Sequence, residues 1–116
     1  MLKRLDNMAV LYCVAIEFEH IADLCDKVRR FNIGLVCDDI VELTRYVRML
    51  TQDLRDNEIR SDVKSIIVEW CEIIEEYSKL AMAERDFPFH LRIKERALHV
   101  KEFILKYGEV CANENS

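Results

Sequence analysis

The sequence predicts an all-α protein, built as an antiparallel up-down-up-down bundle of four helices at about residues 2–31, 35–56, 61–85 and 88–107. Only two glycines and one proline occur in 116 residues, too few for the many turns of a β-sandwich or a barrel. Apolar residues recur every three or four positions through four long segments, which is the spacing of one helix face. The segments follow one another closely, and short connections favour antiparallel neighbours.

The first two segments each carry one continuous apolar stripe. In residues 2–31 the stripe consists of Leu11, Val14, Phe18, Ile21, Cys25 and Val28. In residues 35–56 it consists of Val36, Ile40, Leu43, Val47, Leu50 and Leu54. Between the two stripes lie Asn32 and Gly34, and glycine readily adopts the left-handed conformation that ends a helix. We therefore expect the first helix to end before Gly34.

The last two segments are separated by Pro88, which fixes its own φ and disfavours a helical residue before it. Ser61 is a suitable N-cap for the third helix, whose stripe is Val63, Ile66, Trp70, Ile73, Tyr77 and Leu80, widened by Ile67, Ile74 and Ala81. The stripe of the fourth helix is Ile93, Ala97, Val100, Ile104 and Tyr107. We expect Gly108 to end this helix, residues 1–111 to form one domain, and residues 112–116 to be a frayed tail.

Composition and charge exclude several classes of protein. The chain is 51% hydrophobic and 34% charged, which argues against a disordered protein. Its longest apolar run, residues 8–16, is shorter than the roughly 20 residues that a membrane span needs, so we expect a soluble protein with no membrane partner. The net charge of −5 argues against general nucleic-acid binding.

The five cysteines are an odd number and form no C-x-x-C pair. Cys13, Cys25, Cys37 and Cys71 fall among apolar residues, which favours buried free thiols over a disulfide framework. Free thiols are typical of a reducing compartment, so we expect a cytoplasmic protein.

The first helix is predicted to carry a second apolar stripe that a monomeric bundle does not need. Leu5, Ala9, Tyr12 and Ile16 lie nearly opposite the core stripe, and the fourth helix adds a line at seven-residue spacing, consisting of Leu91, Leu98 and Leu105. Exposed apolar patches usually mark contact sites. We therefore expect these residues to form the interface of a homodimer or of a complex with another protein. The alternative is that the tail or a neighbouring loop covers the second stripe.

A short motif near the start of the fourth helix supplies a second functional hypothesis. Arg85 and His90 have the form R-x4-H, with the polar Asp86 directly after the arginine. At this point the chain resembles the HEPN family of helical ribonucleases and toxins. The resemblance implies a metal-independent ribonuclease in which two copies of Arg85 and His90 meet across a dimer. His90 would act as acid or base, and Arg85 would hold the scissile phosphate.

Other chemical patterns are incomplete. Glu17 and His20 have the Glu-x-x-His spacing of di-iron bundles, but the second such pair that this site requires does not occur. The run of Glu69, Glu72, Glu75 and Glu76 is typical of a solvated face. One face of the fourth helix is basic and consists of Arg92, Arg96 and His99. We expect this face to pair with acidic residues of the third helix. We therefore predict no metal, no cofactor and, in the first hypothesis, a non-enzymatic interaction module.

Overall fold

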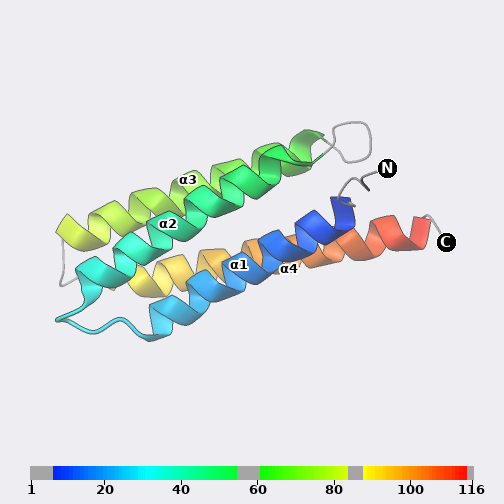
Figure 1. Cartoon of the computed structure of the whole chain (residues 1–116). Coiled ribbons are helices and arrows are strands. Elements are labelled where there is room, and N and C mark those ends of the chain that lie inside the picture. Colours follow the sequence, from blue (N-terminus) through cyan, green and yellow to red (C-terminus); the bar gives the residue numbers. More distant parts are fainter. Residues whose placement is uncertain (1–6, 55–60, 84–87, 115–116) are drawn as a thin grey trace.

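A computed structural model of the chain describes residues 7–54, 61–83 and 88–114, and it contains four helices and no strand in these ranges (Figure 1). The helices are α1 (Asn7–Asp26), α2 (Ile33–Gln52), α3 (Ser61–Ala83) and α4 (Phe89–Glu114). They lie lengthwise beside one another in a body of 49 × 26 × 21 Å. The all-helical fold class is therefore confirmed.

Each helix packs against two others, and the four enclose a main core and a smaller buried cluster of Ile33, Cys37, Ala81 and Phe89. α1 contacts α4 and α2, and α3 contacts α2 and α4. Two ion pairs connect α1 to α4: Lys94 Nζ lies 2.7 Å from Asp26 Oδ1, and Lys101 Nζ lies 3.6 Å from Glu19 Oε1. The later residue of α4, Lys101, pairs with the earlier residue of α1, Glu19.

The first helix ends at Asp26, five residues earlier than expected, because Asn32 builds a turn behind it. The Asn32 side chain accepts a hydrogen bond from the Arg29 amide at 2.6 Å and donates one to the Lys27 carbonyl at 3.0 Å. Asn32 then precedes α2, so Gly34 lies in the first turn of α2 and does not end α1. The first helix does end before Gly34, as expected, but the prediction that Gly34 terminates it in a left-handed conformation was wrong.

The fourth helix continues through Gly108 to Glu114, so the predicted stop at Gly108 was also wrong and the helix enters the segment expected to be a tail. No residue of the described chain has a positive φ, which means that neither glycine is needed for a left-handed backbone. At Gly108 the close approach of α1 accounts for the small residue. A Cβ there would lie 2.9 Å from Met8 Cε.

Replacing either glycine by alanine is expected to stabilise the protein, because alanine exceeds glycine in helix propensity by about 1 kcal/mol. For Gly34→Ala we expect most of this gain, since a Cβ there meets no atom within 4 Å. For Gly108→Ala we expect a smaller gain, because the flexible end of Met8 must move. Urea unfolding of both variants checks this. A loss of stability in Gly34→Ala, or a larger gain in Gly108→Ala than in Gly34→Ala, would contradict it.

The core contains the predicted stripes of α1 and α4 almost unchanged, whereas the buried face of α3 differs from its prediction. Phe18, Ile21, Ile93 and Val100 are fully buried. On α3 the buried line consists of Val63, Ile67, Cys71, Ile74, Ser78 and Ala81. The expected centre of the stripe, including Trp70 and Tyr77, is only half-buried. Val63, Ile67, Ile74 and Ala81 belong to the predicted stripe or its widening, so the buried face is shifted toward Cys71 and Ser78, which the prediction did not include.

Of the four cysteines that were expected to be buried, three are. Cys25, Cys37 and Cys71 are buried free thiols, but Cys13 is exposed. Cys13 lies next to Tyr12 on the outer side of α1, so the prediction that it packs in the core was wrong. The side chain of Cys111 lies outside the described residues.

Candidate functional site

The predicted second stripe of α1 lies on the protein surface. Tyr12 is 58% exposed, although it stands between the buried residues Leu11 and Val14. Ala9 is exposed and Ile16 is half-buried, and both lie one turn from Tyr12. Leu5 lies outside the described residues. A large apolar side chain that is mostly exposed in the middle of a core helix is the kind of feature that marks a contact surface.

On α4, only one of the three predicted interface residues lies beside Tyr12. Leu105 is 40% exposed, and it lines a small pocket together with Met8, Leu11, Tyr12, Ile104 and Gly108. The missing side chain at Gly108 helps to leave this hollow open. We call Ala9, Tyr12, Ile16 and Leu105 the Tyr12 patch.

The other two predicted residues of α4 have different surroundings. Leu98 is half-buried and packs against the core. Leu91 is 57% exposed but lies one turn before Lys94, which pairs with the last residue of α1. Leu91 therefore belongs to the opposite end of α1 from Tyr12, and the predicted line at seven-residue spacing does not form one surface with the patch.

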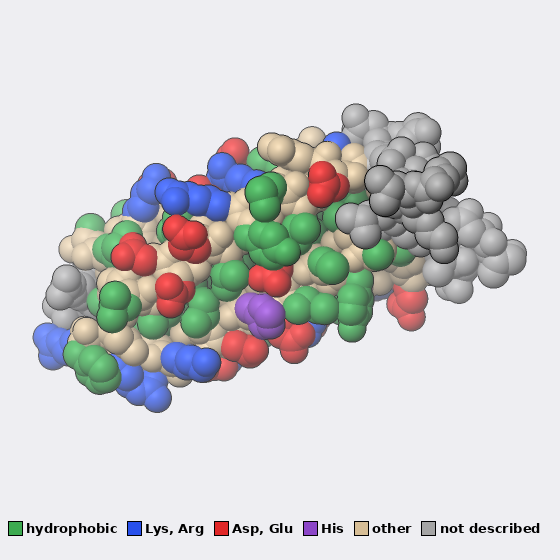
Figure 2. All heavy atoms as spheres, in the orientation of Figure 1, with side chains coloured by type: hydrophobic (Ala, Val, Ile, Leu, Met, Phe, Trp, Pro, Cys, Tyr) green, Lys and Arg blue, Asp and Glu red, His purple; other side chains and the backbone are tan. Residues whose placement is uncertain are grey.

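Hydrophobic side chains on the face that includes α1 and α2 extend beyond the predicted stripe. Figure 2 shows them gathered over the middle of both helices. α2 contributes Tyr46, which is 43% exposed, and Met49, which is 59% exposed. These two residues were missed because α2 was interpreted as a one-sided helix. Tyr46 and Met49 are three residues apart, so they share one helix face, and neither belongs to the core stripe. This pattern could have identified them from the sequence.

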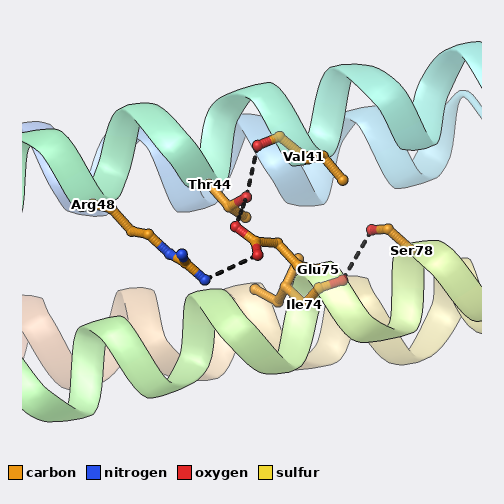
Figure 3. Close-up of polar contacts among 6 residues, drawn as sticks. All are labelled: Val41, Thr44, Arg48, Ile74, Glu75 and Ser78. Carbon is orange, nitrogen blue, oxygen red and sulfur yellow. Dashed lines mark hydrogen bonds and ion pairs between the residues drawn. The ribbon is translucent and has the colours of Figure 1, made fainter.

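A polar cluster between α2 and α3 was also missed (Figure 3). Arg48 Nη2 donates a hydrogen bond to Glu75 Oε2 at 2.9 Å. The fully buried Thr44 hydroxyl lies 2.8 Å from Glu75 Oε1 and 2.7 Å from the Val41 carbonyl, so its single proton is shared between two acceptors. Glu75 was expected on a solvated face, and this is wrong: its side chain is only 18% exposed.

The cluster continues inward to a thiol. Arg48 also acts on the buried Cys71, because its positive charge lowers the pKa of the thiol. Burial acts in the opposite direction and is the larger effect, so the pKa of Cys71 is raised to about 12. A thiol in this state is protonated at neutral pH and is a poor nucleophile. The arrangement is that of a structural link between two helices.

Beside this cluster, the surface between α2 and α3 is hollowed. Arg48, Lys64, Glu69 and Glu72 contribute charges to its walls, along with Thr51, Gln52, Ser65 and Val68. The walls carry two cations and two acids, so the hollow has no single sign of charge that would select a charged ligand.

Arg96 and His99, on the basic face of α4, contact aromatic rings of α3, where pairing with acidic residues was expected. The Arg96 guanidinium lies 5.4 Å from the centre of the Trp70 ring and 5.6 Å from that of Tyr77. The His99 and Trp70 rings are 5.3 Å apart. Cation–π contacts of this kind stabilise the seam between the helices. They also explain why Trp70 and Tyr77 lie beside the core and not in its centre.

The two residues of the R-x4-H motif cannot both be placed. His90 is half-buried in the first turn of α4, and its Nδ1 atom is buried without a hydrogen-bond partner among the described residues. Arg85 lies outside the described residues. The ribonuclease interpretation therefore stays a prediction.

Within residues 7–54, 61–83 and 88–114, no group of three or more His, Cys, Asp or Glu side chains is placed to hold a metal ion. Glu17 and His20 do lie together, with Oε2 and Nδ1 3.6 Å apart, but Glu17 is only 15% exposed and does not point outward as expected. None of the helices in the described chain has an apolar stretch long enough to cross a membrane.

Comparison of the chain with models of protein families, with curated proteins and with solved structures found no match.

Proposed function

We propose that this chain is a non-enzymatic protein-interaction module, an adaptor or small subunit, that binds through the Tyr12 patch. The observation that carries the proposal is the 58% exposure of Tyr12 beside a hollow lined by Leu105 and Gly108. Tyrosine is enriched among residues that dominate binding energy, because its ring supplies apolar area and its hydroxyl a polar handle. In the form that we propose first, the partner is a second copy of the chain.

A two-fold dimer suits this patch because the same residues serve both subunits. Ala9, Tyr12 and Ile16 lie on successive turns of one helix, so two copies of α1 can pack side by side through them. The pocket next to Tyr12 offers space for an apolar group of the partner. Further along α1 the outer face becomes charged at Glu19, which would end the apolar contact.

We further propose an antiparallel up-down-up-down topology and a cytoplasmic location. The two ion pairs between α1 and α4, whose residue numbers run in opposite order, support the antiparallel arrangement of this pair. The buried free thiols Cys25, Cys37 and Cys71 are typical of a protein in a reducing compartment.

The double variant Tyr12→Glu/Ile16→Glu is expected to abolish self-association, because two carboxylates would have to be buried in the contact. Sedimentation velocity measures the oligomeric state across a range of concentrations. Leu91→Glu is a matched control, since Leu91 is 57% exposed and lies at the opposite end of α1 from Tyr12. We expect this variant to associate like the wild type. Association that survives the double variant, with unchanged helix content, would remove the patch as the binding site.

A further inference from the structure

The end of the molecule where α1 passes into α2 combines a rigid turn with exposed apolar side chains. The Asn32 side chain holds the turn through its hydrogen bonds with the Arg29 backbone N–H and the Lys27 carbonyl. The Asn32 backbone N–H also donates to the Arg29 carbonyl at 3.1 Å. At its apex Phe31 is 88% exposed, and Leu35, one helical turn further along, is 71% exposed. These are the two most exposed of the large hydrophobic side chains in the described chain.

Three cations stand close to Phe31 in the sequence, and one of them, Arg29, donates through Nη1 to the Asp26 and Val28 carbonyls. Lys27, Arg29 and Arg30 are all exposed within five residues of Phe31. The nearest acid on α1, Asp26, is already paired with Lys94 at 2.7 Å, and this hydrogen bond raises the pKa of Lys94. We call Lys27, Arg29, Arg30, Phe31 and Leu35 the basic tip. It is locally positive in a chain whose net charge is −5.

We propose that the basic tip docks end-on at the surface of a membrane that contains anionic lipids. Phe31 and Leu35 would enter the interface between headgroups and acyl chains, and the three cations would lie at the level of the phosphates. Aromatic side chains beside Lys and Arg are the usual composition of a segment that binds a membrane surface. This contact requires no spanning helix.

The charge distribution favours an anionic lipid surface over an apolar partner. A surface that covered only Phe31 and Leu35 would have to desolvate the adjacent arginines, whereas a sheet of lipid phosphates compensates them. Exposed acids of α2, Asp38 and Asp39, lie about one turn of 5.4 Å further from the tip than Leu35, so an end-on approach keeps them away from the lipid. The turn is already ordered, so little conformational entropy is lost on docking.

Sedimentation with vesicles tests the proposal. The full chain is mixed at low salt with vesicles of phosphatidylcholine alone or of phosphatidylcholine with phosphatidylserine. We expect binding only to the vesicles that contain phosphatidylserine, and binding that weakens as salt is added. Phe31→Ser is expected to weaken it on the order of tenfold, from the lost burial of the ring. Lys27→Glu is expected to weaken it by on the order of tenfold or more, because a favourable charge is reversed.

Three control variants complete the design. Met49→Ser removes an exposed apolar side chain elsewhere, and Lys106→Glu reverses an exposed charge on the far part of α4. Tyr12→Glu disables the Tyr12 patch. All three are expected to bind vesicles like the wild type, so this proposal and the proposed function fail separately.

Three outcomes would overturn the proposal. The first is equal sedimentation with both kinds of vesicle, or none with either. The second is wild-type binding by Phe31→Ser while circular dichroism shows the same helix content. The third is a loss of self-association in Phe31→Ser, which would assign the tip to a second copy of the chain.

Discussion

Raising the pH above 9.0 is expected to lower the free energy of unfolding steeply, by up to about 1.4 kcal/mol per pH unit for each of two buried thiols. Cys25 and Cys71 are 2% and 0% exposed. Burial raises the pKa of each from the ordinary 9.0 to about 12. For Cys25, the neighbouring Asp26 and Cys37 act in the same direction, while Lys94 opposes them.

The direction of the effect follows from proton binding. Between pH 9.0 and about 12, the unfolded chain releases these protons while the folded chain keeps them. The folded state then binds more protons, so stability falls as the pH rises. The stabilising contribution is fully present below pH 9.0 and is lost progressively above it.

Urea unfolding at a series of pH values, from neutral to about 11, measures this loss. Tyrosines and lysines titrate in the same range, so the informative quantity is the difference between wild type and the Cys25→Ala/Cys71→Ala variant. We expect a shallower pH dependence in this variant. Cys13→Ser, which removes an exposed thiol, is expected to retain the wild-type slope. Equal slopes in wild type and the double variant would contradict the account.

Replacing Glu75 by glutamine is expected to destabilise the protein by about 1–2 kcal/mol. The substitution keeps the shape and the contact with Thr44 but removes the charge that compensates Arg48. The Arg48 side chain is 35% exposed, so solvent screens part of the loss and the full penalty of a buried unpaired charge does not apply. Chemical denaturation measures the change.

Two comparisons separate the ion pair from other effects. Glu72→Gln and Glu76→Gln remove exposed acids of the same helix, and we expect each to change stability by less than about 0.5 kcal/mol. In the double variant Arg48→Met/Glu75→Gln, the loss should be smaller than the sum of the two single losses, because neither charge is left behind. Strict additivity would show that Arg48 and Glu75 do not interact in solution.

The sequence predicts the helices well because their cores depend on local periodicity. The stripes of α1 and α4 repeat every three or four residues without interruption, and all of the expected stripe residues except Val28 and Tyr107 are buried. The ends of the helices depend on contacts that periodicity does not contain. Gly34 and Gly108 were interpreted as stops from residue type alone. The side chain of Asn32 ends α1 earlier, and Gly108 accommodates Met8 within a continuous helix.

The buried face of α3 shows a second limit of sequence patterns. Trp70 and Tyr77 are large and apolar, so they were assigned to the centre of the stripe. In the structure the small Cys71 and Ser78 occupy that position, and the Ser78 hydroxyl is satisfied by the Ile74 carbonyl at 2.9 Å. Trp70 and Tyr77 instead cover Arg96. The position of these two rings beside the core therefore depends on Arg96 of the facing helix α4, which the pattern of α3 alone does not contain.

The candidate sites were predictable to different degrees. Tyr12 was identified because an apolar residue opposite a core stripe is visible on a helical wheel. Glu75 was not, because its partners Thr44 and Arg48 are about thirty residues away and only the fold brings them together. Phe31 was placed inside the first helix, so its position at the apex of a turn followed only from the structure.

Light scattering behind a sizing column tests most directly whether the Tyr12 patch binds a second copy. One chain has a mass of 13.8 kDa. At high micromolar concentration we predict a wild-type mass of twice this value, and the single-chain mass for Tyr12→Glu/Ile16→Glu at the same concentration. A wild-type mass of 13.8 kDa at every concentration would contradict self-association through the patch.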